Sequence, residues 1–163
     1  MRGKMEQIAS IYQNGITEIV AELFQSMLAT EVSALPSGQE HSAKGHVTAL
    51  VSFGGTWRGV LEFECGSAEA VQFARRFLQT DEFQECNADV RDSLGELANI
   101  VAGNLKALMA GQVTLCTPSV VEGSDYSVRV CGGTLVGESW FKTDVGTFAI
   151  RLLEDTLALG AQK

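Results

Sequence analysis

Four polar or small residues recur with helical spacing in the stretch RDSLGELANIVAGNLKALM. They are Asp92, Glu96, Asn99 and Gly103. An advance of about 100° per residue places them within one arc of roughly 80°, which Lys106 shares. Carboxylates and an amide offer ion-pair and hydrogen-bond partners, and a glycine leaves a bare patch that another molecule can approach closely. These residue types suit a docking face for another protein.

The opposite side of the same stretch is apolar. With the same advance of about 100° per residue from Asp92, its residues lie between roughly 140° and 240° around the helix axis. They are Leu94, Leu97, Ala98, Val101, Leu105 and Leu108. Because this stripe faces the core, the polar row faces outward, either as a docking face or as a merely solvated one. In an exposed helix interior, Asn and Gly each cost several tenths to about 1 kcal/mol relative to Ala. Helix propensity therefore does not explain Asn99 and Gly103, and the residues by themselves leave both a docking face and a solvated face open.

Three helices are predicted from apolar spacing and end signals. The first spans about residues 5–31, where apolar residues recur at intervals of three and four. The second is AEAVQFARRFLQ, with Ser67 as its N-cap and Glu69 near its N-terminus. The third spans about residues 89–110 and ends at Gly111. The outward polar row lies on this third helix.

The remaining segments are rich in β-formers. HVTALVSFGGTWRGVLEFEC predicts a hairpin around GGT, after the break SALPSGQEHSAKG. Four later runs predict antiparallel strands, and they are QVTLCTPSVVEG, YSVRVCG, TLVGESWFKT and GTFAIRLLED. The order helix, hairpin, helix, helix, hairpin, hairpin is typical of an α+β fold. We predict a single domain over 1–163, with a core of about 5–155 and long helices packed on an antiparallel sheet of about six strands.

Composition narrows the possible partners. The chain has 163 residues, with 12 Lys and Arg against 20 Asp and Glu and a formal net charge of −8. Without a basic cluster, nucleic acid and anionic membranes are poor partners. No apolar run reaches the ~18 residues of a membrane span. The start MRGKMEQIASIYQNG lacks the features of a signal peptide, so we expect a cytoplasmic protein.

Cysteines and histidines give no predicted metal site. The cysteines Cys65, Cys86, Cys116 and Cys131 are widely spaced and form no C-x-x-C pair. We expect reduced core or half-buried thiols rather than a disulfide, a zinc site or a nucleophile. His41 and His46 lie in or near a polar loop and are expected at the surface.

The stretch DSLGELANIVAGN resembles the signature helix of the CheC/CheX/FliY chemotaxis phosphatases, particularly the CheX-like branch. The resemblance lies in a D-x-x-x-E-x-x-N pattern at Asp92, Glu96 and Asn99. A downstream proline completes the family signature, and Pro118 in TLCTPSVVEG is its match. The order of helices and hairpins agrees with the family fold over about residues 5–155.

Two departures favour the CheX-like branch with one site per chain. Pro118 follows Asn99 more closely than in CheC-type signatures, so the turn between them is shorter. CheC carries two signature helices, whereas the first helix here offers Glu18 with Ala21 where the asparagine would stand.

The resemblance implies hydrolysis of the aspartyl phosphate of a CheY-like response regulator. It assigns Asn99 to positioning the attacking water and Glu96 to pairing with the regulator's active-site lysine. Asp92, Gly103 and Pro118 would contact or shape the docking patch, although Asp92 could equally complement the helix N-terminus. The resemblance implies no cofactor of the chain's own, because the regulator supplies Mg²⁺.

Two further expectations accompany this interpretation. A homodimer is expected from the CheX resemblance and from strand edges that need covering. The alternative function is a non-catalytic module that binds a response regulator or a CheD-like partner. Other phosphatase and nucleotide-binding classes lack their residues, since the sequence has no G-x-S-x-G, no phosphate-cradling glycine loop and no C-x5-R motif.

Overall fold

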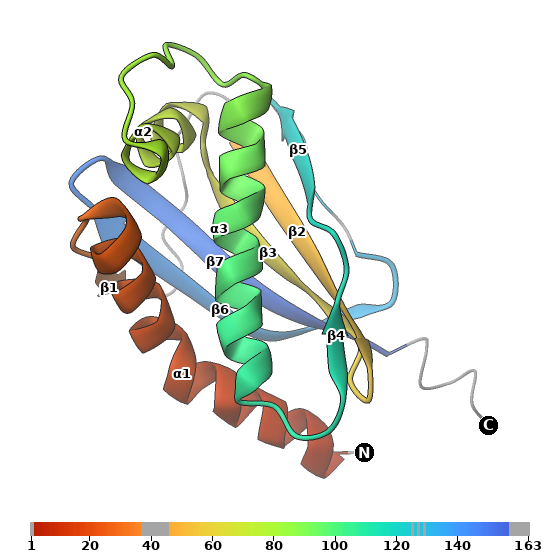
Figure 1. The fold of residues 1–163 in the computed structure, drawn as a ribbon. Helices are drawn as coiled ribbons and strands as arrows, with labels where there is room; N and C mark the ends of the chain where they lie inside the picture. The colour runs from red at the N-terminus through yellow and green to blue at the C-terminus, as the bar shows by residue number, and fades with distance from the viewer. Residues whose placement is uncertain (1, 37–45, 125, 127, 129, 157–163) are drawn as a thin grey trace.

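The computed structural model describes residues 2–36, 46–124, 126, 128 and 130–156. These residues form one antiparallel sheet of seven strands with three helices on one face, as Figure 1 shows. The helices are α1 (Arg2–Leu28), α2 (Ser67–Leu78) and α3 (Ala88–Ala107). The strands are β1 (Ser33–Leu35), β2 (His46–Gly55), β3 (Gly59–Gly66), β4 (Val113–Leu115), β5 (Ser119–Gly123), β6 (Gly133–Thr143) and β7 (Gly146–Asp155). The predicted α+β architecture is confirmed.

Strand β2 pairs with the two short strands, β4 and β5, at the edge of the sheet that lies beside α3. The strand order is β1-β6-β7-β3-β2-β4, and β5 also pairs with β2. Hairpins join β2 to β3 and β6 to β7. Strand β4 pairs with residues 53–55 of β2, whereas β5 pairs with residues 46–50. Strands β4 and β5 therefore form one interrupted edge strand.

The core lies between the helices and the sheet and centres on phenylalanine rings. Phe24 of α1 stacks on Phe148 of β7 with ring centroids 4.7 Å apart, and Phe148 stacks on Phe63 of β3 at 5.0 Å. Phe73 of α2 meets Phe24 edge-on at 5.3 Å. These rings are fully buried, and such aromatic pairs contribute beyond their buried area. They fix two of the helices to the middle of the sheet.

The opposite face of the sheet carries a charged cluster around Arg151 of β7. Side chains alternate along a strand, so Glu62 and Glu64 point away from the helices while Phe63 points toward them. Arg151 donates hydrogen bonds to Glu64 and, over 2.6 Å, to Glu138 of β6. Its guanidinium lies 3.8 Å from the Glu62 carboxylate. Four charged groups on three strands thus share this face.

The helix ends differ from the prediction in three places. Helix α1 begins at Arg2 and ends at Leu28, about three residues earlier at each end than predicted. Gly66 rather than Ser67 is the N-cap of α2, and no side chain caps that helix. Helix α3 ends at Ala107, so Leu108 is its C-cap and is 51% exposed instead of buried. The apolar pattern continues past the point where the backbone leaves the helix.

The strand prediction is correct for β2, β3, β6 and β7 but not for the region between α3 and β6. The run QVTLCTPSVVEG is divided into β4 and β5, which pair with β2 instead of forming a hairpin with the next run. Positions 127 and 129 of the run YSVRVCG lie outside the described residues, and its other residues are in no strand. Strand β1 lies within the predicted break and pairs with β6.

The cysteine prediction is partly wrong. All four thiols are free, and Cys65 is buried and Cys86 half-buried as expected, but Cys116 and Cys131 are exposed. His46 is only partly exposed, with its Nδ1 3.7 Å from a Glu64 oxygen, whereas His41 lies outside the described residues. No described helix is long and apolar enough to cross a membrane.

The charged cluster predicts opposite effects of two charge-removing substitutions. Burial acts to raise the pKa of Glu138, but hydrogen bonds from Arg151 and Trp140 outweigh it and lower this pKa. Ionised Glu138 therefore stabilises the fold above the unfolded-state pKa of about 4.3, and this stabilisation is lost as the pH falls through the lower folded-state value. Burial raises the pKa of Glu62, so its charge opposes folding at neutral pH.

We expect Glu138→Gln to lower the free energy of unfolding at pH 7 by about 1 kcal/mol and to flatten its decline toward pH 3. Glu62→Gln is expected to lower the free energy of unfolding at pH 7 by less than Glu138→Gln does, or to raise it. Urea unfolding at several pH values measures both effects. A larger loss for Glu62→Gln than for Glu138→Gln at pH 7 would contradict this electrostatic interpretation.

Candidate functional site on helix α3

Helix α3 is held on the sheet along one side and at its N-terminal end. Nine of its residues are buried, and they are Val90, Ser93, Leu94, Gly95, Leu97, Ala98, Val101, Ala102 and Leu105. The Asn87 side chain accepts a hydrogen bond of 3.0 Å from the Val90 amide, which caps the helix. The helix contacts α1, α2 and strands β2 to β5. It is therefore a rigid element with only one side free.

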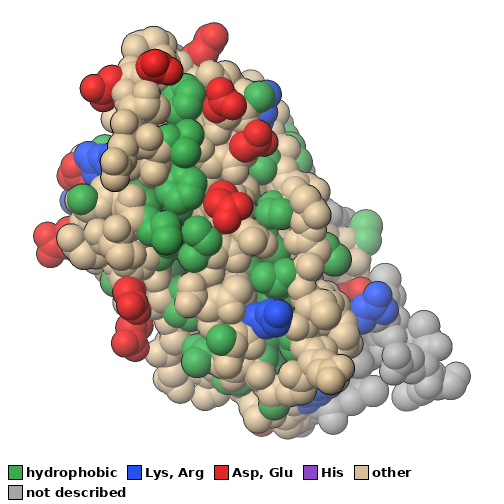
Figure 2. Space-filling model, viewed as in Figure 1, with side chains coloured by type: hydrophobic (Ala, Val, Ile, Leu, Met, Phe, Trp, Pro, Cys, Tyr) green, Lys and Arg blue, Asp and Glu red, His purple; other side chains and the backbone are tan. Residues whose placement is uncertain are grey.

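The polar row lies on that free side. Asp92 and Glu96 are exposed, and Asn99 and Gly103 are partly exposed. Figure 2 shows acidic side chains exposed on the surface over α3, with a Lys or Arg side chain farther toward the C-terminal end of the helix. The sequence prediction that the row faces outward is confirmed.

The side chains of the row have no partner among the described residues. Asp92, Glu96 and Asn99 form no side-chain hydrogen bond or ion pair there. Asn104, one turn beyond Ile100, differs because its amide donates a hydrogen bond of 2.9 Å to the Ile100 carbonyl. The amide of Asn99 and the carboxylate of Glu96 are thus free to bind groups from outside the chain.

Pro118 lies beside the row because the edge strand is interrupted there. It follows β4 and directly precedes β5, where a residue without an N–H does not break a continuous ladder. A Cβ placed on Gly95 would lie 3.5 Å from Pro118 Cβ and 3.3 Å from Val120 Cγ2. The missing side chain of Gly95 therefore lets the edge strand pack closely on α3, one turn before Asn99. Our sequence reasoning missed Gly95, although a glycine inside a helical pattern is a visible signal.

A second connection joins the start of α3 to β5. Arg91 donates hydrogen bonds to the Glu122 carboxylate at 2.7 Å and to the Cys86 carbonyl at 3.3 Å. Burial, followed by the nearby Glu122 charge, raises the pKa of the Cys86 thiol to about 11. Cys86 is therefore protonated at neutral pH and is not a thiolate nucleophile beside the site.

The site is an outward-facing helix surface rather than a pocket. An open pocket of about 540 Å³ lies elsewhere, at the end of α1 and the β6–β7 turn, and it contains none of the predicted site residues. Across the described residues, no group of three or more His, Cys, Asp or Glu side chains could hold a metal ion. The Glu96 and Asn99 side chains therefore lie on the surface of a helix and outside that pocket.

Comparison with known families agrees with this geometry. The family model for "Chemotaxis phosphatase CheX" matches residues 47–136, which is more than half of the chain and includes all of α3 and Pro118. The chain belongs to the CheX family. Among curated proteins, no significant match was found.

Solved structures share the fold at low sequence identity. CheX from Vibrio vulnificus aligns with a TM-score of 0.71 and 23% identity, covering 86% of this chain and 94% of the other. CheX from Desulfovibrio desulfuricans aligns with a TM-score of 0.71 and 23% identity, covering 91% and 99%. The CheX-CheY-BeF3-Mg complex from Borrelia burgdorferi aligns with a TM-score of 0.65 and 15% identity, covering 88% and 97%. This CheX family member therefore has its family's fold over nearly its whole length.

Gly103 yields a stability prediction for the free side of α3. A Cβ at this position would meet only Leu115 Cδ1 at 3.9 Å, an ordinary contact. We expect Gly103→Ala to raise the free energy of unfolding by about 0.5–1 kcal/mol through helix propensity. Gly95→Ala should raise the free energy of unfolding by less, because the added Cβ would lie too close to the Val120 side chain. Urea unfolding measures both, and a destabilised Gly103→Ala variant would show that Gly103 is required by the fold itself.

Proposed function

We propose that the chain hydrolyses the aspartyl phosphate of a CheY-like response regulator. The observation that carries this proposal is the pair Glu96 and Asn99, unpartnered within the described chain, on the rigid helix inside the CheX match. The Borrelia complex, which joins a CheX to CheY with BeF3 and Mg²⁺, supports a regulator as the partner. The substrate is thus another protein's phosphorylated aspartate.

Asn99 positions the attacking water. Its amide oxygen accepts a hydrogen bond from a water molecule, which holds the water in line with the phosphorus atom. The water oxygen bonds to phosphorus while the bond between phosphorus and the aspartyl oxygen breaks, giving inorganic phosphate and a free carboxylate. An amide serves better than a carboxylate because it adds no negative charge beside the phosphoryl group. The phosphoryl charge is offset by the Mg²⁺ and lysine of the regulator.

Glu96 sets the position at which Asn99 enters the regulator. Glu96 precedes Asn99 by three residues, so the two side chains project from the same side of the helix about one turn apart. Its carboxylate pairs with the regulator's active-site lysine, a charge-assisted contact that fixes distance and orientation. Asp92, Gly103 and Pro118 complete the contact surface, with Gly103 admitting the regulator's loops and Pro118 shaping the adjoining edge.

The decay of a phosphorylated regulator tests these roles. The wild-type chain should shorten the lifetime of at least one CheY-like regulator of the source organism. Asn99→Ala should lower kcat by about 10²-fold or more, because the water is no longer positioned. Glu96→Ala should mainly raise KM, because the charged contact to lysine is lost.

Asn104→Ala is the matched control, since Asn104 is an exposed asparagine of the same helix whose amide is already bound to a backbone carbonyl. With Asn104→Ala, the phosphorylated regulator should have the same lifetime as with the wild-type chain. If the wild-type chain changes the lifetime of no regulator that it binds, the non-catalytic binding module is the correct function.

We also propose that the chain is a homodimer. Strand β1 pairs with only three residues of β6, at 140–142, so the outer edge of the preceding β6 residues has no strand partner in the described part of the chain. Leu135 on that strand is 53% exposed. An uncovered edge of this kind favours pairing with a second copy.

Light scattering tests the dimer. We expect a mass of twice 17.5 kDa for the wild type and a shift toward monomer for Leu135→Lys, because a charge on an edge strand opposes edge pairing. Val121→Lys, which changes a 40%-exposed valine on the opposite edge, is the control. A wild-type mass of 17.5 kDa at every concentration would contradict the proposal.

A further inference from the structure

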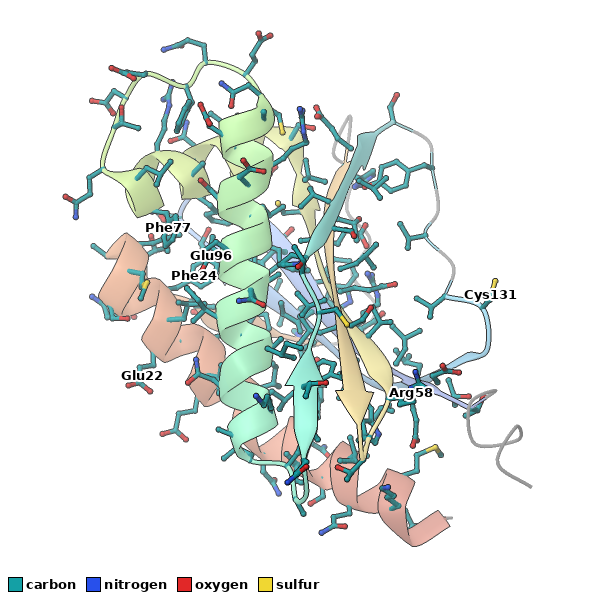
Figure 3. The ribbon with its side chains drawn as sticks, turned by 45° about the vertical axis from the view of Figure 1, so that its right-hand side comes forward. Glu22, Phe24, Arg58, Phe77, Glu96 and Cys131 are labelled. Carbon is teal, nitrogen blue, oxygen red and sulfur yellow. The ribbon has the colours of Figure 1, made fainter. Side chains whose placement is uncertain are left out.

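Beside the Glu96 and Asn99 pair, all three helices contribute a partly exposed apolar side chain. These are Ile19 of α1, Phe77 of α2 and Ile100 of α3, which pack against the core yet remain partly exposed. We call these three side chains the apolar band. Figure 2 shows hydrophobic atoms gathered between α3 and the other two helices, next to the acidic side chains of α3. In Figure 3, the labelled Phe77 belongs to α2 and the labelled Glu96 to α3, and α2 packs against α3.

The band is continuous with the polar row. Ile100 follows Asn99 directly and follows Glu96 by one helical turn, so Ile100 and Glu96 have Cβ atoms about 5–6 Å apart. On α1, a Cβ on Gly15 would meet the Cδ1 atoms of Leu108, the C-cap of α3, and of Ile19. Ile19 therefore projects from the side of α1 that faces α3. A molecule that covers Glu96 and Asn99 therefore meets Ile100, the member of the band on α3.

Exposed carboxylates flank the band on α1 and on α3. Asp92 and Glu96 are exposed along α3, and Glu18 and Glu22 are exposed along α1. Figure 3 shows Glu22 projecting outward from α1. None of these four carboxylates has an ion-pair partner among the described residues. The surface that fits here is apolar at its centre and basic at its edges.

We propose that the apolar band selects the regulator by seating an apolar side chain of its receiver domain, next to the lysine that pairs with Glu96. This inference rests on the proposed function and names the chemistry of the substrate that the site prefers. The preferred regulator has an apolar side chain about one helical turn from its active-site lysine, with further basic residues that face Glu18 and Glu22. Apolar contact at this place also excludes bulk water around Asn99.

Steady-state dephosphorylation of the preferred regulator, phosphorylated with acetyl phosphate, tests the band. Ile100→Thr should raise KM about three- to tenfold with little change in kcat, because the lost contact aids binding but not the positioning of water. Ile100→Val should restore most of the affinity. Val121→Thr is the control, because it also replaces an exposed β-branched apolar residue with threonine, here on the edge strand β5. It should leave KM unchanged.

A charge reversal gives a second readout that does not depend on core packing. Glu22→Lys should raise KM about two- to tenfold at low salt, with a smaller effect at high salt. Glu31→Lys, which reverses an exposed charge beyond the end of α1, should not raise KM. If Ile100→Thr does not fold, the KM values of Glu22→Lys and Ile100→Val are compared with that of the wild type instead.

Three results would overturn the proposal. One is a folded Ile100→Thr variant with the same KM as Val121→Thr. Another is a Glu22→Lys variant with wild-type KM at low salt. The third is a change in oligomeric mass for Ile100→Thr with unchanged KM, which would mean that a second copy covers the band. In all three cases the wild type still dephosphorylates the regulator, so the proposed function stands. A wild type that acts on no regulator overturns both.

Discussion

The burial of one side of α3 against the sheet is the constraint on which the rest of the structure depends. Leu94, Leu97, Val101 and Leu105 are almost entirely removed from solvent, and burial of each such side chain contributes roughly 1.5–3 kcal/mol. Rotation of the helix would expose this stripe, so the orientation of the opposite side is fixed. The Asn87 cap and the Arg91–Glu122 ion pair fix the start of the helix as well. Glu96 and Asn99 consequently project at a defined angle without any further support.

This arrangement suits a reaction whose other requirements are met by the partner. Acyl phosphates are reactive, so hydrolysis needs a positioned water and compensation of charge more than a strong base or a covalent nucleophile. A helix that presents an amide and a carboxylate one turn apart can supply position alone. On this account the chain holds one half of an active site, and the regulator holds the aspartyl phosphate, the lysine and the Mg²⁺. The apolar band would determine which regulator completes the site.

The sequence was sufficient where periodic patterns decide the structure. The apolar spacing located α3 and showed which side carries Asp92, Glu96 and Asn99, because a helix of that length repeats its pattern several times. The hairpins β2–β3 and β6–β7 followed from runs of β-forming residues separated by glycine breaks. The proposed function rests on the likeness of a short motif to a family, since the geometry of the row alone left docking and solvation both open.

The sequence was insufficient where long-range contacts decide. Leu108 fits the apolar stripe, but the backbone leaves the helix one residue before it, which places its side chain partly in solvent. The division between β4 and β5, with Pro118 in the interval, depends on pairing with β2, which lies far earlier in the chain. The close approach of Pro118 to Gly95 has the same origin. A local pattern cannot encode contacts between segments so far apart.

A comparison of two substrates tests the central claim that this chain supplies only half of an active site. The wild-type chain would be mixed with acetyl phosphate alone, and separately with a regulator carrying the same acyl phosphate linkage on its aspartate. We expect faster hydrolysis of the regulator's aspartyl phosphate and no acceleration for acetyl phosphate, because acetyl phosphate alone brings no lysine and no Mg²⁺ in register with Asn99. Comparable acceleration of both reactions would mean instead that this chain holds a complete hydrolytic site.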